Sequence, residues 1–286
     1  MSKFFSNWQL GVGIPVFLII VLTAVFAPLI ATHDPVSTNV QRRFELPGAV
    51  YTFEDDNGHE VRARNLLGTD ELGRDIWSRL VFGARVSITI GITATALGAF
   101  VGIIAGLVTG YFGSMVDAVI MRIIDVMMAF PGMLLALFVV AIMGPSMLTV
   151  IIAVAIFTIP AFSRIVRGSV LDVRKLEYID AVRAVGATDI RIIFRHIFPN
   201  VLSPIIVQAT LNVGTAIVVS AALSFLGVGI QAPTPEWGTM LYNGRLDLWR
   251  APHLTMIPGL TIFIVVISIN LIGDGLRLAL EPKKNK

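Results

Sequence analysis

The chain has no cysteine among its 286 residues. Disulfides, thiolate metal sites and a cysteine nucleophile are therefore excluded. Charged residues are also scarce, at 14% of the chain against roughly a quarter of an average soluble domain. Hydrophobic residues make up 55%, and this imbalance predicts an integral membrane protein. The net charge of +3 is not gathered into a basic run with interleaved aromatics, so we expect no nucleic-acid partner.

The sequence also lacks the glycine-rich loop and lysine that cradle nucleotide phosphates, so ATP, Mg²⁺ and other cofactors are not expected to bind this chain. No ionisable residue lies near the middle of an apolar run, as a proton pump or secondary transporter would need. Arg122 and Asp125 lie three residues apart near a helix start and are expected to form a local ion pair. The four histidines fall in loops or at interfaces: His33, His59, His196 and His253. This position argues against an intramembrane hydrolase, and we expect no catalytic and no metal-binding residues. A channel or secondary transporter is the less favoured alternative.

Long uncharged runs predict six membrane-spanning helices, because each needs about 20 apolar residues. The runs are 11–31, 86–116, 126–163 (two helices separated by a turn at 144–146), 202–228 and 254–272. The predicted fold class is an all-α membrane protein. Its parts are an N-terminal anchor helix in 1–31, an external loop at 32–83, a five-helix core at 84–282 with a coupling loop at 167–200, and a tail at 283–286.

Basic residues set the expected orientation. The C-terminal EPKKNK and the segment from Arg164 to Arg195 mark one side as cytoplasmic under the positive-inside rule. The external loop is basic too, but long loops cross the membrane largely regardless of charge. An even number of spans then places both termini in the cytoplasm of a multi-pass protein of the bacterial cytoplasmic membrane.

Glycines recur every four residues in the second span, at Gly98, Gly102, Gly106 and Gly110. Such a smooth ridge lets helix backbones approach closely in lipid, where burial of apolar surface does not drive association. The sequence leaves open whether the ridge packs within this chain or against a partner subunit.

The polar stretch 177–200 reads EYIDAVRAVGATDIRIIFRHIFPN and interrupts two apolar runs. Good helix formers predict a helix that Gly186 ends, and Gly186 is expected to have a positive φ or to pack closely on a partner. Thr188 can cap a second helix with Asp189 at its positive end, and Pro199 is expected to stop that helix. Four apolar residues of the second helix predict one stripe that needs an apolar partner: Ile190, Ile193, Phe194 and Ile197. The alternative is an ordinary amphipathic hairpin between membrane helices.

This stretch resembles the coupling motif of ABC-importer permeases, in which Glu-Ala-Ala is followed after three residues by Gly and after nine more by Ile-x-Leu-Pro. Asp180, Ala181 and Val182 stand at the first three positions, and Gly186 and Pro199 have the required spacing. The Ile, the Leu and one Ala of the pattern are not matched. Segments 65–87, 224–245 and 258–278 add to a likeness to the C-type permease subunit of dipeptide/oligopeptide/nickel ABC importers, over residues 65 to 282. Residues 32–64 match no pattern that we recognise.

The resemblance implies a type I importer permease with six spans and a cytoplasmic coupling hairpin. It implies as partners a homologous B-type permease, two ATPase subunits that bind ATP and Mg²⁺, and an extracytoplasmic substrate-binding protein, besides the lipid bilayer. The residues expected to couple to the ATPase are Glu177, Asp180, Ala181, Arg183, Gly186, Asp189, Phe194 and Pro199. The cargo stays open among dipeptides, oligopeptides, nickel chelates and certain oligosaccharides.

Polar residues of the fifth span are candidates for the translocation pathway. Gln208, Asn212 and Thr215 fall on one helical face, as a pathway lining would. Hydrogen bonding between helices is the alternative.

Acidic and aromatic residues on the external side are candidates for contact with the binding protein. The residues concerned are Asp70, Asp75, Glu236 and Trp237. For tryptophans at this level, including Trp249, the alternative is an anchor at the membrane interface.

Overall fold

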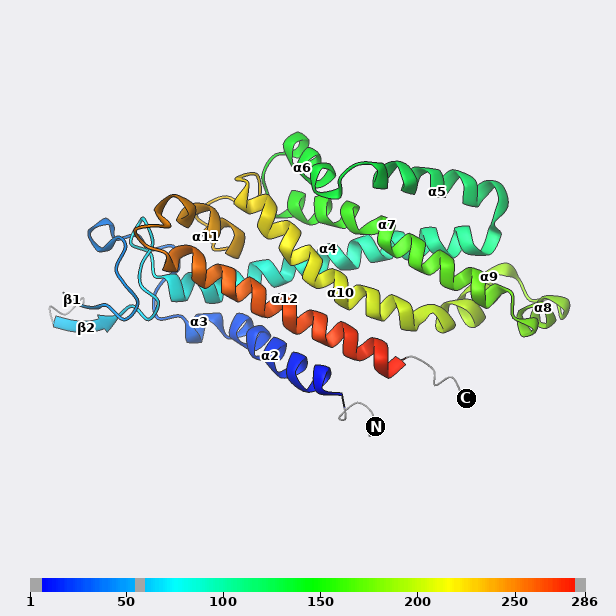
Figure 1. The fold of residues 1–286 in the computed structure, drawn as a ribbon, viewed down its shortest axis with the longest axis horizontal. Coiled ribbons are helices and arrows are strands. Elements are labelled where there is room, and N and C mark those ends of the chain that lie inside the picture. Colours follow the sequence, from blue (N-terminus) through cyan, green and yellow to red (C-terminus); the bar gives the residue numbers. More distant parts are fainter. Residues whose placement is uncertain (1–6, 55–59, 281–286) are drawn as a thin grey trace.

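The structure, a computed structural model, describes residues 7–54 and 60–280 as an elongated bundle of helices (Figure 1). Helix α2 (Trp8–Val25) begins, and helix α12 (His253–Leu280) ends, at the same end of the bundle. Strands β1 (Val50–Glu54) and β2 (Glu60–Arg64) pair antiparallel beyond the opposite end. The predicted tail at 283–286 lies outside the described residues.

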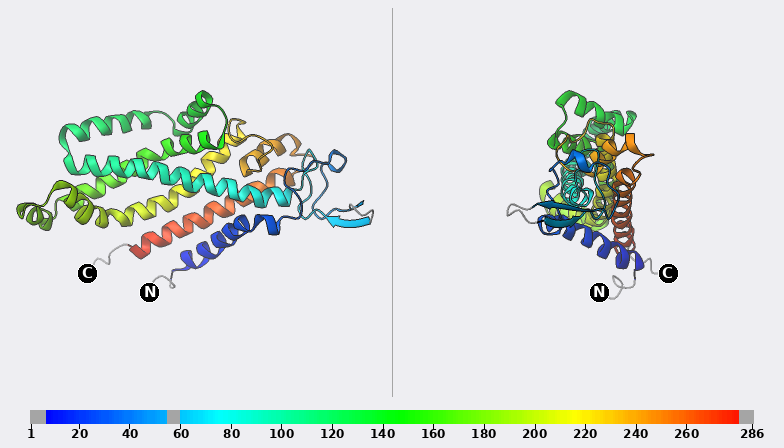
Figure 2. Two further views of the ribbon diagram at one scale, coloured as in Figure 1. Left: turned by 180° about the vertical axis from the view of Figure 1, so that it is seen from behind. Right: turned by 90° about the vertical axis from the view of Figure 1, so that its left-hand side faces the viewer.

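The remaining elements complete the bundle in chain order. They are α3 (Ala27–Ile30), α4 (Ile76–Phe112), α5 (Ser114–Ala129), α6 (Gly132–Met143), α7 (Met147–Arg174), α8 (Glu177–Ala184), α9 (Asp189–Ile192), a π-helical turn (Ile193–Ile197), α10 (Phe198–Phe225) and α11 (Trp237–Gly244), with short 3-10 turns at Val40–Arg42 and Arg245–Asp247. Figure 2 shows α5 and α6 on one flank of the bundle and α2 on the other.

Five helical segments among the described residues are long and apolar enough to cross a membrane: α2, α4, α7, α12 and the continuous run Asp189–Phe225. A sixth crossing exists if α5 and α6, which are bent by 90°, count as one broken span. The helix predicted from 126 to the turn at 144–146 is thus interrupted by a bend that the prediction did not include. Pro131 has no N–H to donate, and the residue before it, Phe130, is extended, so the helix breaks there.

The turn predicted at 144–146 is confirmed. Helix α6 ends at Met143, Gly144 has a φ of +82°, and the Ser146 side chain accepts a hydrogen bond from the Thr149 N–H at the start of α7. Serine at this position satisfies one of the free N–H groups of the first helical turn.

Helix α4 begins at Ile76, inside the segment predicted as an external loop. The Asp75 side chain caps it by accepting a hydrogen bond from the Ser78 N–H at 2.8 Å. Its 37 residues correspond to about 55 Å of helix, longer than the roughly 30 Å hydrocarbon layer. The helix therefore extends beyond that layer.

The glycine ridge of α4 packs against α7 within this chain. A Cβ atom at Gly102 would lie 2.5 Å from Phe162 Cβ, and one at Gly106 would lie 2.6 Å from Val166 Cβ. Both distances are too short for real side chains, so the close contact exists only because these residues are glycine. Of the two packing alternatives, the structure shows the one within the chain.

The acidic residues of α5 pair with α7. Arg164 Nη2 donates to Asp125 Oδ1 at 2.7 Å, across 39 positions of sequence. Arg167 donates from Nε and Nη2 to the two carboxylate oxygens of Asp117, both at 2.6 Å. The local pair predicted between Arg122 and Asp125 is therefore wrong, because the antiparallel neighbour α7 supplies the arginine.

Candidate functional site at the coupling hairpin

Helices α8 and α9 form a hairpin at the end of α7 (Figure 1). The Gly186 N–H donates to the Arg183 carbonyl at 3.0 Å, and the Ala187 N–H donates to the Val182 carbonyl at 3.3 Å. This is the Schellman pairing that ends many helices at a left-handed residue. Gly186 supplies that residue with a φ of +87°, so the predicted positive φ is confirmed.

Apolar side chains on the inner side of the hairpin hold it to the bundle. Ile179 of α8 and Ile192 of α9 are fully buried. They belong to one cluster with residues of α4, α7 and α10: Leu107, Tyr111, Val166, Val170, Val201 and Ile205. The hairpin is therefore packed on three long helices and can transmit a displacement to them.

The apolar stripe predicted for the second helix divides in two. Ile193 and Ile197 are buried in this chain, whereas Ile190 and Phe194 are 72% and 63% exposed. The π-helical turn at 193–197 is wider than an α-helical turn, so positions spaced for one α-helical face point in two directions. The apolar surface left for a partner consists of Ile190 and Phe194, with Val185, 89% exposed, at the turn.

The prediction that Pro199 stops the second helix is wrong. Pro199 lies in the first turn of α10, directly after the π-helical turn, and the chain is helical from Asp189 to Phe225. The wider turn before Pro199 relieves the need for its missing N–H. Thr188 stands at the N-cap of α9 as predicted, but its side chain makes no capping hydrogen bond.

Polar contacts also connect the hairpin to α4. The Tyr111 hydroxyl donates to Asp189 Oδ1 at 2.5 Å, and the Arg183 guanidinium carbon lies 5.9 Å from the centre of the Tyr111 ring. Arg183 Nη1 lies 3.4 Å from Asp180 Oδ1. The pKa of Arg183 is raised above its ordinary value, mainly by the Tyr111 side chain and to a smaller extent by the carboxylates of Asp180 and Asp189.

A hollow of about 420 Å³ lies beside the turn. Small and apolar residues form most of its lining: Ala181, Val182, Val185, Gly186 and Ala187. Arg191 and His196, whose side chains can carry positive charge, complete it. Glu177 begins α8 and is exposed. The structure thus gathers the predicted coupling residues from Glu177 to Phe194 on the hairpin, with Pro199 just after it. Their contact with an ATPase stays a prediction.

Reversing the charge of Asp180 should impair coupling without unfolding the hairpin. The side chain is 72% exposed, and an exposed ion pair such as that with Arg183 contributes at most about 1 kcal/mol. Asp180→Lys should therefore leave insertion and the unfolding temperature unchanged, while substrate-stimulated ATP hydrolysis and uptake in reconstituted vesicles fall several-fold. Asp172→Lys makes the same charge change at an exposed position of α7 outside the hairpin and should be tolerated. Equal uptake by the two variants would show that Asp180 is not a coupling residue.

The three predicted pathway residues of α10 lie in different environments. Asn212 is 5% exposed, and its Nδ2 donates to the Gln208 carbonyl at 3.1 Å. Thr215 is exposed. Gln208 lines a hollow of about 390 Å³ together with Arg277 of α12. In this chain Gln208 and Thr215 therefore present surface and Asn212 does not, and the pathway role stays a prediction.

The external residues predicted to contact a binding protein are buried. The exposed fractions are 7% for Asp70, 4% for Asp75, and 0% for Glu236 and Trp237. Asp75 caps α4, and Glu236 caps α11 by accepting from the Thr239 N–H at 2.8 Å. Caps at helix N-termini satisfy free N–H groups, which gives both carboxylates a structural role.

Asp70 and Trp237 also have partners within the chain. Asp70 Oδ2 lies 2.6 Å from Arg74 Nε, and Trp237 Nε1 donates to the Leu80 carbonyl at 3.0 Å. In this conformation all four side chains have partners within the chain, and their contact with a binding protein stays a prediction. Trp249, by contrast, is 98% exposed and presents its ring to the surroundings.

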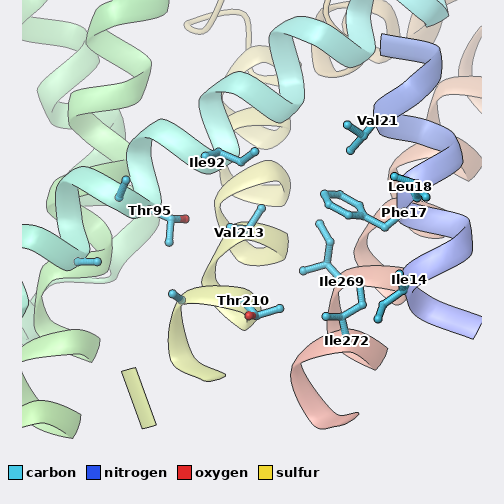
Figure 3. A pocket seen from close by; sticks show the side chains of 13 residues that line it. Ile14, Phe17, Leu18, Val21, Ile92, Thr95, Thr210, Val213, Ile269 and Ile272 are labelled. Carbon is cyan, nitrogen blue, oxygen red and sulfur yellow. The ribbon is translucent and has the colours of Figure 1, made fainter. Parts of the chain in front are cut away.

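An apolar hollow of about 610 Å³ lies among α2, α4, α10 and α12 (Figure 3). Thr95 and Thr210 are the only polar residues that line it. Helix α2 is joined to its neighbours at both ends, by the Arg85 Nη2 bond to the Val25 carbonyl at 2.6 Å and by the Asn7 Nδ2 bond to the Gly275 carbonyl at 3.2 Å. The apolar walls do not suit charged cargo, so we do not assign this hollow to the pathway.

Family comparisons agree with this architecture. Residues 98–286 match the family described as binding-protein-dependent transport system inner membrane component, and residues 1–47 match the N-terminal transmembrane domain of oligopeptide transport permease C. The second match includes residues 32–47. The statement that residues 32–64 match no pattern is therefore wrong for residues 32–47. The fold and the hairpin are those of a type I ABC importer permease. The chain belongs to the binding-protein-dependent transport inner membrane components, and it is a multi-pass protein of the inner membrane.

Similar proteins carry the names of permeases for dipeptides, di/tripeptides and glutathione. The chain is 46% identical to the dipeptide transport system permease protein DppC of Alkalihalophilus pseudofirmus, over 95% of this chain and 85% of the relative. It is 45% identical to the di/tripeptide permease DppC of Pseudomonas aeruginosa, over 95% and 87%. It is 51% identical to the glutathione permease GsiD of Pectobacterium atrosepticum, over 76% and 72%. The resemblance to C-type permeases is thereby confirmed.

Solved structures agree with the fold. The methionine ABC transporter MetNI, in an inward-facing conformation, has a TM-score of 0.60 at 20% identity, over 72% of this chain and 98% of the other. An amino acid ABC transporter with histidines has a TM-score of 0.56 at 15% identity, over 71% and 94%.

Proposed function

We propose that this chain is the permease subunit of an ATP-driven importer that moves short peptides handed over by a substrate-binding protein. The observation that carries the proposal is the similarity, over 95% of the chain, to permeases named for dipeptides and di/tripeptides. Nickel chelates and oligosaccharides are the alternative cargoes. The chain itself performs no covalent chemistry, and ATP and Mg²⁺ bind to the partner ATPases.

The hairpin supports a specific route for the energy of ATP hydrolysis. An ATPase groove would take Ile190, Phe194 and Val185, the apolar side chains that the hairpin leaves exposed. The run Asp189–Phe225 is helical throughout, so a push on its cytoplasmic end reaches the far side of the membrane along one helix. Closure of the ATPases would thus reorient α10 and open the pathway to the other side.

Co-expression with a related permease, two ATPases and a binding protein tests the proposal. We expect a stable heteromeric complex whose ATP hydrolysis and uptake in vesicles respond to di- and tripeptides, and not to nickel chelates or oligosaccharides. The reverse cargo preference would replace the proposed substrate. A stable, active form of this chain alone would contradict the proposed assembly.

The orientation of the chain can be tested separately, because this chain has no native cysteine. We propose that the strands lie outside and the coupling hairpin inside, with both termini in the cytoplasm. A cysteine at Thr52, exposed on β1, should then react with a membrane-impermeant thiol reagent added to intact cells, and a cysteine at exposed Asp189 should react only after permeabilisation. The opposite labelling pattern would invert the topology.

A further inference from the structure

Helix α5 is the long helix with the weakest apolar attachment to the described bundle. Ile124 is the only buried residue among its 16. The helix starts at a tight turn, where Gly113 has a φ of +64° and Ser114 a φ of +49°, and it ends at the 90° break before α6. Hinges at both ends and little buried surface would let α5 move relative to the bundle unless other contacts fix it.

Two ion pairs fix α5 to α7. The Arg167–Asp117 pair is bidentate, with both N–O distances at 2.6 Å, and its side chains are 34% and 22% exposed. The Arg164–Asp125 pair has a distance of 2.7 Å, and its side chains are 49% and 52% exposed. A planar guanidinium held by both carboxylate oxygens restricts rotation as well as distance, so the first pair sets the orientation of α5.

Helix α7 in turn packs against the hairpin. Val166 and Val170 of α7 belong to the apolar cluster that buries Ile179 and Ile192 of the hairpin. Arg167 lies between these two valines, so the residue that holds Asp117 is on the same helical segment that supports the hairpin. A displacement of the hairpin therefore acts on the ion pairs directly.

The exposure of the Arg164–Asp125 pair indicates what α5 faces. Both residues lie on helices of the membrane bundle and are about half exposed in this chain. Charges on such helices avoid lipid and face water-filled space or other protein. The α5 face that carries Asp125 is therefore directed toward water, which on the cytoplasmic side includes bulk solvent, or toward another subunit.

We propose that Asp117–Arg167 and Asp125–Arg164 are positioning pairs that make α5 follow α7, so that the coupling hairpin moves α5 as well. This inference rests on the proposed import function. Arg167 and Asp117 hold α5 at a fixed angle to α7, and Arg164 and Asp125 hold its C-terminal half. ATPase closure would then move the hairpin, α7 and α5 as one unit.

Charge reversal tests whether the pairs carry coupling. Asp117→Arg and Arg167→Asp should each lower uptake roughly fivefold or more, the lower range for coupling between distant sites. Each single variant places like charges together, and the double reversal restores opposite charges. The double variant should recover most of the uptake. Arg122→Asp reverses an exposed arginine of the same helix outside the pairs and should transport normally.

The ratio of uptake to ATP hydrolysis separates positioning from folding. The single variants should hydrolyse ATP in the assembled complex while transporting little, because the hairpin still docks but α5 no longer follows. Single variants that transport normally would overturn the proposal, as would a double variant with no more uptake than the single ones.

A distance measurement tests the rigid unit without any cargo. Spin labels on Val119→Cys of α5 and Gly168→Cys of α7, both exposed positions, should give the same narrow distance distribution with and without ATP and vanadate. Replacing Asp117 and Asp125 by alanine should broaden it. In the complex that keeps both ion pairs, a shift of several Å between nucleotide states would overturn the proposal even if peptide import is confirmed. If the complex imports no peptide, the proposed function fails while this measurement still decides the inference.

Discussion

Gly186→Val should reduce uptake at least several-fold while the chain still inserts and assembles. At a φ of +87° the valine Cβ is strained against its own backbone, which costs about 1–3 kcal/mol. No other atom lies within 4 Å of the position a Cβ would take, so the effect comes from backbone strain and not from a clash. Relief of this strain opens the Schellman turn and misdirects Val185 and Ile190, two of the side chains offered to the ATPase. The measurement is peptide uptake together with substrate-stimulated ATP hydrolysis in reconstituted vesicles.

Two other glycines provide matched controls. Gly144 has the same backbone conformation, with a φ of +82°, and also has no atom within 4 Å, but it lies at the turn between α6 and α7 away from the hairpin. Gly144→Val should therefore lower stability by a similar amount and leave the ratio of uptake to ATP hydrolysis unchanged. Gly11 has equal space in a helix without positive φ, so Gly11→Val should change neither. Normal uptake by Gly186→Val would deprive the hairpin of its coupling role.

Local rules correctly predict the turn of the hairpin and the turn at 144–146. In both cases a glycine must follow a helix end, and the conformation depends only on neighbouring residues. Pro131 is a signal for a helix break in the sequence as well, but we gave it no weight because it lies inside an uncharged run from 126 to 163. A run that is long enough for two spans does not reveal that its first part bends by 90°.

A long-range contact explains why the predicted local ion pair is wrong. The partner of Asp125 is 39 residues away on α7, and nothing local distinguishes it from Arg122. Asp75 and Glu236 could have been recognised as helix caps, because each directly precedes a helix and accepts from the third N–H after it. The π-helical turn, at which the apolar stripe of the hairpin divides, was not predicted from the sequence.

Gly102→Val should lower the stability of the assembled complex more than any other substitution considered above. Even the first carbon of a side chain at Gly102 would lie 2.5 Å from Phe162 Cβ and 2.8 Å from the Ile159 carbonyl oxygen. The obstacle is backbone and a fully buried aromatic residue, so α4 and α7 must separate, and we expect a cost at the upper end of the roughly 1–3 kcal/mol that overpacking typically causes. Separation of α4 from α7 also disturbs the cluster that supports the hairpin, so uptake should fall together with stability.

The measurement is the unfolding temperature and yield of the purified complex, with Gly168→Val as the matched control. Gly168 lies on α7 with no atom of this chain within 4 Å of a Cβ, so valine there does not disturb the packing of α4 on α7. We expect the control to unfold within about 2 °C of the unmodified complex, the shift that less than 1 kcal/mol produces at this size. Gly102→Val should unfold several degrees lower. Equal stability of the two variants would contradict the role of the glycine ridge. It would mean that α4 and α7 can accommodate a side chain at Gly102 and are not packed as closely as the structure shows.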